Sequence, residues 1–254
     1  MNTAIGRLAA SLIATVLFAA ACTSAPGAPP TAAPPPATNT SVPTVTRPPN
    51  TSTPVPTPSA TPYPVFWDDF DGEFLEGWTW IRENDALWSL VSEPGYLRIV
   101  LDSSRPPRNL LVREVGSPNF QIMTHVLFEP TSNYQFAGLL VYEDDDTTAS
   151  LGRAYCNNPG TCVGNGIYFD ASQDGQFLGT NFGIDTPIKD EAYLRIDRAG
   201  YSLKAYYSED GANWTFLGEH VVTMLDPKVG LIAANSHVVG AVALFDYFTA
   251  MEMP

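Results

Sequence analysis

Between residues 65 and 254 the chain consists of short runs in which apolar side chains recur at every second position. The runs are rich in β-branched and aromatic residues, which favour strands, and Gly, Pro, Asn and Asp clusters separate them. No segment keeps a helical period over a dozen residues. The pattern predicts an all-β fold, a two-sheet antiparallel jelly-roll sandwich, because 190 residues exceed an immunoglobulin domain of about 100 and no internal repeat suggests a propeller. The runs are YLRIVL at 96–101, NLLVREV at 109–115, FQIMTHVLF at 120–128, FAGLLVY at 136–142, AYLRID at 192–197, YSLKAYY at 201–207, VGLIAA at 229–234 and VALFDYF at 242–248.

Residues 1–21 have the pattern of an export signal. A basic residue precedes an apolar run at 8–18, which is shorter than the roughly 20 residues of a membrane-spanning helix. A small-residue triplet directly before Cys22 resembles the lipobox of bacterial lipoproteins, and this resemblance implies lipidation of Cys22. An ordinary secretory signal with an incidental cysteine is the alternative. We expect a lipid-anchored protein on the extracytoplasmic face of the cell envelope.

Residues 22–64 form a segment of different composition, which contains 14 of the 23 prolines and few large apolar residues. Such a segment has no core to offset its chain entropy and is typical of an extended linker. At about 3.1 Å per residue in the polyproline II limit, it would span on the order of 100 Å. It would therefore act as a spacer between membrane and domain.

The charge is concentrated in the predicted domain. All 27 acidic residues lie at 65–254 together with 11 of the 13 basic ones, which gives this segment a formal charge of −16. Such a surface repels nucleic acid and anionic lipid, and it suits neutral ligands, cations or Ca²⁺. We expect a monomer that meets the membrane only through its N-terminal lipid and does not bind nucleic acid.

Cys156 and Cys162 are the first and last residues of the sequence CNNPGTC, whose Asn-Asn-Pro-Gly centre favours a turn. In an oxidising compartment the pair is expected to form a disulfide that closes a short loop. A metal site is the alternative, but no histidine or further cysteine lies nearby in the sequence to complete a zinc set.

The stretch SEDGANW at 208–214 resembles the Asp box of sialidase propellers. The chain has one copy, with Asp210 and Gly211 adjacent, whereas propellers repeat the motif. Asp-Gly between two strands favours a tight hairpin in which both turn residues have positive φ. We therefore interpret the motif as a hairpin turn with Trp214 packed beside it.

The order of several segments resembles the concanavalin A-like domains typified by the C-terminal module of family 43 β-xylosidases and the related DUF1349 group. The segments are VFWDDFDGEFLEGWTWIRENDALWSLVSEPGYLRIVL at 65–101, FAGLLVYEDD at 136–145, AYLRIDRAGYSLKAYYSEDGANWTFLG at 192–218, VGLIAAN at 229–235 and ALFDYF at 243–248. The resemblance implies two stacked antiparallel sheets, often associated with glycan recognition. Such sandwiches host lectins, hydrolases, lyases and structural modules, so the fold does not settle function.

The sequence offers no convincing pair of catalytic groups. Retaining glycosidases need two carboxylates about 5 Å apart, and the Glu-x-Asp-x-x-Glu strand of jelly-roll glucanases is absent. Four consecutive acids at 143–146 are interpreted as a solvated turn. His125, His220 and His237 lie in unrelated contexts, although acids from separate strands could still meet in space.

Aromatic residues are the candidates for ligand binding. In GWTWIR, Trp78, Trp80 and Arg82 fall on one face of a strand, and Trp88 alternates similarly in LWSLV. Indole and phenol rings beside hydrogen-bonding groups suit sugar recognition. The alternative is that these rings pack in the core. The predicted ligand-binding residues are Trp78, Trp80, Arg82, Trp88, Tyr134 and Tyr155.

A structural Ca²⁺ is predicted where the chain ends meet. WDDFDG places Asp68, Asp69 and Asp71 near the first strand, and Asp246 lies in an otherwise apolar last strand. Carboxylate and carbonyl oxygens suit Ca²⁺, and the resemblance implies such a site in related jelly rolls. The alternative is that these acids end strands or accept backbone hydrogen bonds.

Three functional hypotheses follow. The first is a non-catalytic, lectin-like module that binds a glycan at the cell surface. The second is a glycoside hydrolase or lyase of the same fold. The third is a structural or protein-binding module of the envelope. The missing acid pair favours the first and third over the second.

Overall fold

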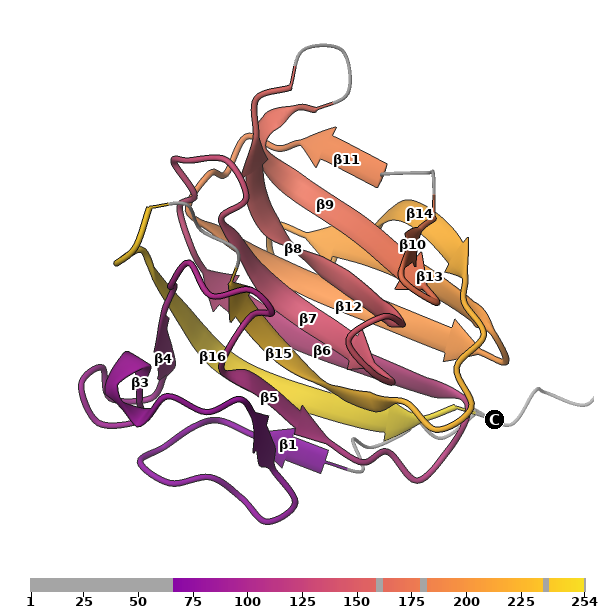
Figure 1. Ribbon diagram of the computed structural model, residues 1–254, viewed down its shortest axis with the longest axis horizontal. Helices are drawn as coiled ribbons and strands as arrows, with labels where there is room; N and C mark the ends of the chain where they lie inside the picture. Colours follow the sequence, from indigo (N-terminus) through magenta and orange to yellow (C-terminus); the bar gives the residue numbers. More distant parts are fainter. Residues whose placement is uncertain (1–65, 159–161, 179–181, 235–237, 254) are drawn as a thin grey trace, which may run out of the picture. The chain divides into compact units, whose positions relative to one another are not determined.

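The computed structural model describes residues 66–158, 162–178, 182–234 and 238–253, which form two stacked eight-stranded sheets (Figure 1). Neighbouring strands pair antiparallel throughout. A single 3-10 turn, η1 (Asp85–Leu87), is the helical element of the described residues, and no helix there is long and apolar enough to cross a membrane. The predicted all-β jelly-roll sandwich is confirmed. The predicted signal at 1–21, lipidation at Cys22, the linker at 22–64 and His237 lie outside the described residues.

Sheet A runs in the order β14-β13-β12-β6-β16-β4-β3, with β1 also paired to β16. Its strands are β1 (Phe66–Asp68), β3 (Trp88–Ser89), β4 (Leu97–Val100), β6 (Phe120–Leu127), β12 (Glu191–Ala199), β13 (Ser202–Ser208), β14 (Thr215–Val221) and β16 (Val242–Glu252).

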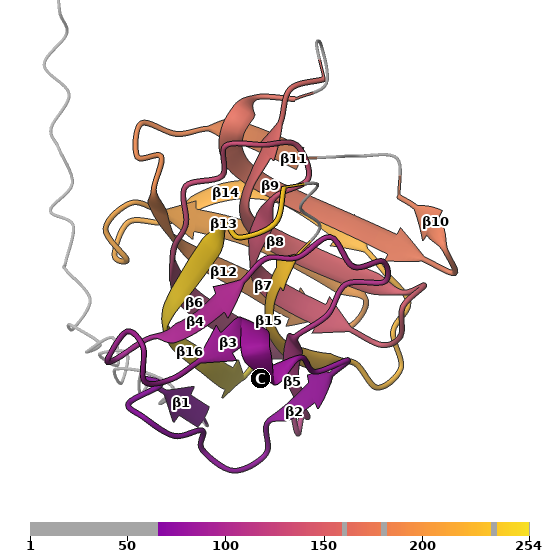
Figure 2. The same ribbon diagram turned by 60° about the vertical axis from the view of Figure 1, so that its left-hand side comes forward.

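Sheet B runs in the order β10-β9-β8-β7-β15-β5-β2, with β11 also paired to β9. Its strands are β2 (Thr79–Ile81), β5 (Leu110–Arg113), β7 (Phe136–Tyr142), β8 (Thr148–Cys156), β9 (Gly164–Gln173), β10 (Gln176–Phe177), β11 (Phe182–Asp185) and β15 (Lys228–Ala234). The strands β1, β2 and β3 lie together at one end of the sandwich (Figure 2).

The two sheets differ in how they bury side chains. Sheet A follows the period of two: on β12, Leu194 and Ile196 are buried between the sheets, whereas Tyr193 alternates to the outer face. Sheet B buries apolar side chains on both faces: on β7, Leu139 joins the core between the sheets and Leu140 joins a second buried cluster on the outer face. The part of the outer face that carries this second cluster is therefore largely shielded from solvent.

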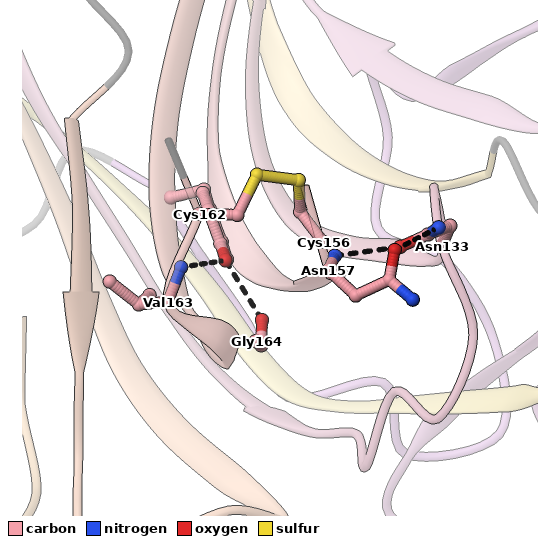
Figure 3. The surroundings of a disulfide bond; sticks show 7 residues. Asn133, Cys156, Asn157, Cys162, Val163 and Gly164 are labelled. Carbon is pink, nitrogen blue, oxygen red and sulfur yellow. Dashed lines mark hydrogen bonds between the residues drawn. A yellow bond between two sulfur atoms is a disulfide. The ribbon is translucent and has the colours of Figure 1, made fainter. Parts of the chain in front are cut away.

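The predicted disulfide between Cys156 and Cys162 is confirmed (Figure 3). Their Cα atoms lie 5.5 Å apart, within the normal range for such a bond. Beside it, the Asn157 backbone N–H donates to Asn133 Oδ1 at 2.8 Å. The disulfide loop is thus tied to the segment that precedes β7.

The predicted hairpin is confirmed, because β13 and β14 are consecutive antiparallel strands, but the expected two-residue turn at Asp210-Gly211 is wrong. β13 ends at Ser208 and β14 begins at Thr215, so residues 209–214 form a longer loop in which Gly211 has positive φ and Asp210 does not. Asp210 Oδ1 accepts from the backbone N–H groups of Ala212 and Asn213 at 2.9 and 2.8 Å. These hydrogen bonds lower the pKa of Asp210 well below its ordinary range. The motif is therefore a carboxylate-centred loop.

Candidate functional site

The predicted aromatic binding face points into the sandwich. Trp78 and Trp80 share a face as predicted, but both rings pack against the core between the sheets. Trp80 and Trp88 have ring centres 5.1 Å apart, and the Trp78 ring lies 5.0 Å from that of Phe248. The indole N–H of Trp78 donates to Asp68 Oδ2 at 2.7 Å. For these three tryptophans the structure favours the core alternative.

Arg82 leaves that face because the regular strand ends at Ile81. Its φ of 54° breaks the alternation of β2. The guanidinium consequently reaches the outer side of sheet B, where Nη1 contacts both carboxylate oxygens of Asp145 at 2.9 Å. Arg82 of the predicted set therefore lines a surface pocket.

The two predicted tyrosines lie near the disulfide end of sheet B. Tyr134 is 59% exposed and the Arg105 guanidinium carbon lies 5.8 Å from its ring centre. Tyr155 on β8 is half-buried, and its carbonyl accepts from the backbone N–H of Tyr134 at 3.1 Å. Exposure leaves Tyr134 accessible to a ligand, so its binding role stays a prediction.

The predicted calcium ligands do not converge. Asp68 is 1% exposed, and its side chain turns inward to accept hydrogen bonds from the backbone N–H groups of Phe70 and Leu75 as well as from Trp78. Asp246 lies on the outer side of sheet A, where its Oδ2 is 3.1 Å from His125 Nδ1. Asp69 is exposed. Among the described residues, no three His, Cys, Asp or Glu side chains form a group that could hold a metal ion, and calcium binding stays a prediction without an assembled ligand set.

A pocket of about 150 Å³ opens on the outer face of sheet B. Its floor is apolar and comes from β5, β7 and β15, because Leu110, Leu140 and Ile232 belong to the second buried cluster. Pro106 and Pro107 of the segment between β4 and β5 form one wall. Thr148 and Ser150 of β8 add two hydroxyl groups. We call this site the sheet B pocket.

The charged wall of the sheet B pocket is an interlocked trio. Asp145 Oδ1 accepts from Arg82 Nη1 and from the Tyr142 hydroxyl, both at 2.9 Å. Burial and the neighbouring Asp145 raise the pKa of Tyr142, so it stays a hydrogen-bond donor at neutral pH. Arg82 Nη2 is buried and has no hydrogen-bond partner among the described residues. The wall therefore presents fixed donors and acceptors beside an apolar floor.

A larger hollow of about 720 Å³ shares Arg82 with this pocket. Its lining is Arg82, Glu83, Asn84, Asp85 and Arg108. These residues supply no apolar floor, whereas ligand sites usually combine apolar surface with a few polar groups. We therefore regard the sheet B pocket as the candidate site and the hollow as an open rim beside it.

Asp170 on β9 is the cross-strand partner of Ser150, and both side chains belong to the outer face of sheet B. Its Oδ1 is buried and no described residue hydrogen bonds to it. Burial raises the pKa of Asp170 to about 6. The Asp170 carboxyl group, whose raised pKa favours the protonated form, therefore lies next to the pocket floor.

Replacing Asp170 with Asn is expected to stabilise the fold by on the order of 2 kcal/mol at pH 7 and to have little effect at pH 4. The folded-state pKa of about 6 exceeds the ordinary value of 3.8, so the folded protein binds the proton more tightly and loses stability as pH rises from about 4 to about 6. Urea unfolding at both pH values measures this, with the exposed Asp71→Asn as control. An equal effect of Asp170→Asn at both pH values would contradict the burial argument.

The four acids at 143–146 have separate structural roles. Asp144 Oδ1 accepts from the backbone N–H groups of Asp146 and Thr147, which confirms the turn interpretation for that residue. Glu143 Oε1 accepts from the Leu225 backbone N–H at 2.8 Å. Asp145 instead belongs to the pocket, and the sequence analysis missed this role because its partner Arg82 lies 63 positions away.

The histidines also have separate environments. His220 is buried between the sheets, where its Nε2 lies 3.2 Å from the carbonyl oxygen of Phe169, and burial lowers its pKa. His125 lies on the outer side of sheet A between two carboxylates. Neither histidine lines the sheet B pocket.

Comparison with known proteins identifies related folds. The family model described as the β-xylosidase C-terminal concanavalin A-like domain matches residues 67–250. A GH43 protein, BlXynB from Bacillus licheniformis, is 21% identical with a TM-score of 0.64, and the match covers 74% of this chain and 39% of that one. A xylan β-1,4-xylosidase from Bacillus halodurans is 22% identical with a TM-score of 0.63, covering 73% of this chain and 39% of the other.

A Bacillus licheniformis β-glucanase is 10% identical with a TM-score of 0.51, and the match covers 74% of this chain and 98% of the β-glucanase. At these identities the likeness concerns the fold alone. No curated protein matches the chain. The match to residues 67–250 spans most of the chain, so the chain belongs to the family of β-xylosidase C-terminal concanavalin A-like domains.

Proposed function

We propose that the sandwich is a non-catalytic, lectin-like module that binds a neutral glycan in the sheet B pocket. The observation that carries this proposal is the pocket's composition: an apolar floor, two hydroxyl groups and the fixed trio of Arg82, Asp145 and Tyr142. Sugars present apolar C–H faces and many hydroxyl groups, which this combination complements. The acidic surface of the domain disfavours an anionic ligand.

The size of the pocket limits what it would hold. About 150 Å³ is below the roughly 300–1,000 Å³ of sites for drug-sized ligands. The pocket would therefore take one sugar unit of the glycan. The remaining sugar units would extend over the open rim beside Arg82. The second buried cluster makes the floor rigid, which lowers the entropy cost of binding.

The cellular setting is part of the same proposal. A lipid on Cys22 and the proline-rich segment at 22–64 would display the module on the extracytoplasmic face of the envelope, within reach of polysaccharides. The match spans 39% of the BlXynB chain and 39% of the xylan β-1,4-xylosidase chain, so the activity of those proteins is not carried over to this chain. Hydrolysis by a concealed acid pair and binding of an envelope protein are the rival outcomes of the experiment.

The test is a glycan array with polysaccharide pull-down, repeated with and without Ca²⁺, followed by a reducing-sugar assay on each retained ligand. Binding without release of reducing ends supports the proposal. Release of reducing ends would replace it with a hydrolase, and an array without any bound glycan would favour a protein-binding module.

For a glycan found in this way, replacing Tyr142 with Ala is expected to weaken binding about tenfold, since a well-packed contact residue typically contributes 1 kcal/mol or more. The change removes a wall of the pocket and the hydroxyl donor to Asp145. Titration calorimetry measures the affinity. The matched control is Tyr201→Ala, because Tyr201 is 48% exposed and lies in the turn between β12 and β13. Unchanged affinity in Tyr142→Ala would place the ligand elsewhere.

A further inference from the structure

Arg82 reaches the sheet B pocket through a backbone conformation that few residues adopt. Its φ of 54° lies in the left-handed region, and so does the φ of 52° at Asn109, the residue before β5. Neither residue is a glycine, so this conformation costs free energy at both positions. Backbone strain of this kind is concentrated at functional sites. The strain at Arg82 therefore points to a role for the direction of its side chain.

Asn109 holds the backbone on both sides of Glu83. Its backbone N–H donates to the carbonyl oxygen of Arg82 at 3.3 Å. Its side-chain Oδ1 accepts from the backbone N–H of Asn84 at 2.6 Å, and its Nδ2 donates to the carbonyl oxygen of Asn84 at 3.2 Å. Asn109 is 2% exposed, so water does not compete for these contacts. The side chain of Asn109 therefore serves the conformation of residues 82–84.

The guanidinium of Arg82 is fixed through two of its three nitrogens. Nε donates to the carbonyl oxygen of Pro107 at 2.7 Å, and Nη1 donates to Asp145. Nη2 is buried and has no hydrogen-bond partner among the described residues. A buried donor without a partner is unfavourable, and a ligand oxygen that accepted from it would remove this penalty. Nη2 is thus an unused donor on a side chain that lines the pocket.

A connection that only had to end β2 would not need an arginine at position 82. Glycine adopts a positive φ without steric cost and brings no buried polar group. Arg82 adds both the strain of its Cβ and a buried donor without a partner. A ligand in the pocket that accepts from Nη2 accounts for both features.

We propose that Arg82 selects the sugar unit in the sheet B pocket by donating from Nη2 to one of its hydroxyl oxygens, and that Asn109 positions Arg82 for this task. The inference rests on the proposed glycan binding and names the ligand class as a fully hydroxylated sugar unit. A deoxy analogue without the accepting hydroxyl is rejected, because Nη2 then stays buried without a partner. Asn109 does not line the pocket and acts through Arg82.

The experiment uses the whole chain and the methyl glycosides of glucose, galactose, mannose and xylose as probes, titrated by NMR. The glycoside that binds best is compared with its monodeoxy analogues. One of these analogues is expected to bind the unchanged protein at least about tenfold more weakly. Asn109→Gly tolerates the positive φ but lacks the side-chain hydrogen bonds to Asn84. It is expected to bind the glycoside about fivefold more weakly and to discriminate less against that analogue.

An Arg82→Met background separates positioning from general stability. There, Asn109→Gly is expected to cause no further loss of affinity, whereas a purely structural asparagine would have the same effect in both backgrounds. The matched control is Asn119→Gly, because Asn119 Oδ1 accepts from the backbone N–H of Gly200 at 2.9 Å and Asn119 does not line the pocket. This control is expected to lower the unfolding midpoint and to keep the affinity of the unchanged protein.

Side-chain ¹⁵N spectra of Arg82 in the free protein give a readout without any sugar. The Nη signals should be resolved in the unchanged protein and averaged by rotation in Asn109→Gly. Equal binding of the glycoside and all its monodeoxy analogues, equal affinity losses in both backgrounds, or unchanged Arg82 signals in Asn109→Gly would overturn the inference and leave glycan binding intact. A protein that binds none of the probes and no glycan on the array would overturn the proposed function as well.

Discussion

Replacing Arg153 with Met is expected to destabilise the sandwich by about 3 kcal/mol, since several buried acceptors lose their donor. Arg153 is fully buried on β8, and its Nη1 donates to the carbonyl oxygens of Ile188 and Glu191 at 2.9 and 3.3 Å. Its Nη2 donates to the side-chain oxygen of Asn165. Removing the buried positive charge offsets part of this loss of stability, because the charge is unfavourably desolvated: burial lowers the pKa of Arg153 to about 10. The unpaired carbonyls outweigh that gain.

Urea unfolding of Arg153→Met beside the exposed Arg108→Met measures the difference. Arg108 has the same side chain at an exposed position, so its replacement is expected to change stability by less than about 0.5 kcal/mol. Equal midpoints for the two variants would show that Arg153 does not hold the 186–191 connection. If only Arg153→Met loses stability, the variant has also lost the hydrogen bond from Arg153 to the carbonyl of Glu191. The side chain of Glu191 contacts His125, so the position of that carboxylate is expected to be less fixed.

The eight alternating runs coincide with eight of the sixteen strands in the described residues, and the longest strands that they miss are β8 and β9. FAGLLVY coincides with β7. The run at 120–128 covers β6, and the run at 192–197 lies within β12. The sequences of β8 and β9 are rich in Gly, Ala and Ser, and both faces of their sheet are buried, so no polar alternation marks them. A Cβ at Gly152 of β8 would lie 2.4 Å from the carbonyl oxygen of Ala137. Close strand approach, which requires glycine, therefore weakened the strand signal.

The candidate site was predictable only in part, because alternation does not say which face of a strand turns inward. Trp78 and Trp80 share a face, as the spacing predicted, but the aromatic neighbours that bury them come from distant segments. Arg82 was included for the wrong reason, since a positive φ moves it away from the tryptophans. Asp145 and Tyr142 became identifiable only when folding brought them to Arg82.

Replacing Asp68 with Ala is expected to cost about 3 kcal/mol, because three donors lose one acceptor. Asp68 Oδ1 accepts from the Phe70 N–H at 2.9 Å, and Oδ2 accepts from the Leu75 N–H and the Trp78 indole at 3.1 and 2.7 Å. The carboxylate thereby fixes the segment between β1 and β2 over the core. Thermal and urea unfolding measure the loss, with the exposed Asp69→Ala as matched control.

The same pair of variants separates this role from calcium binding. If hydrogen bonds to Asp68 account for its importance, EDTA leaves the unfolding midpoint unchanged, and Asp68→Ala is destabilised equally with and without added Ca²⁺. A calcium ion shared by Asp68 and Asp246 would instead make EDTA reproduce the Asp68→Ala loss. The two side chains point to opposite sides of sheet A, Asp68 toward Trp78 and Asp246 toward His125. Because one ion cannot contact both carboxylates in this arrangement, the first result is expected.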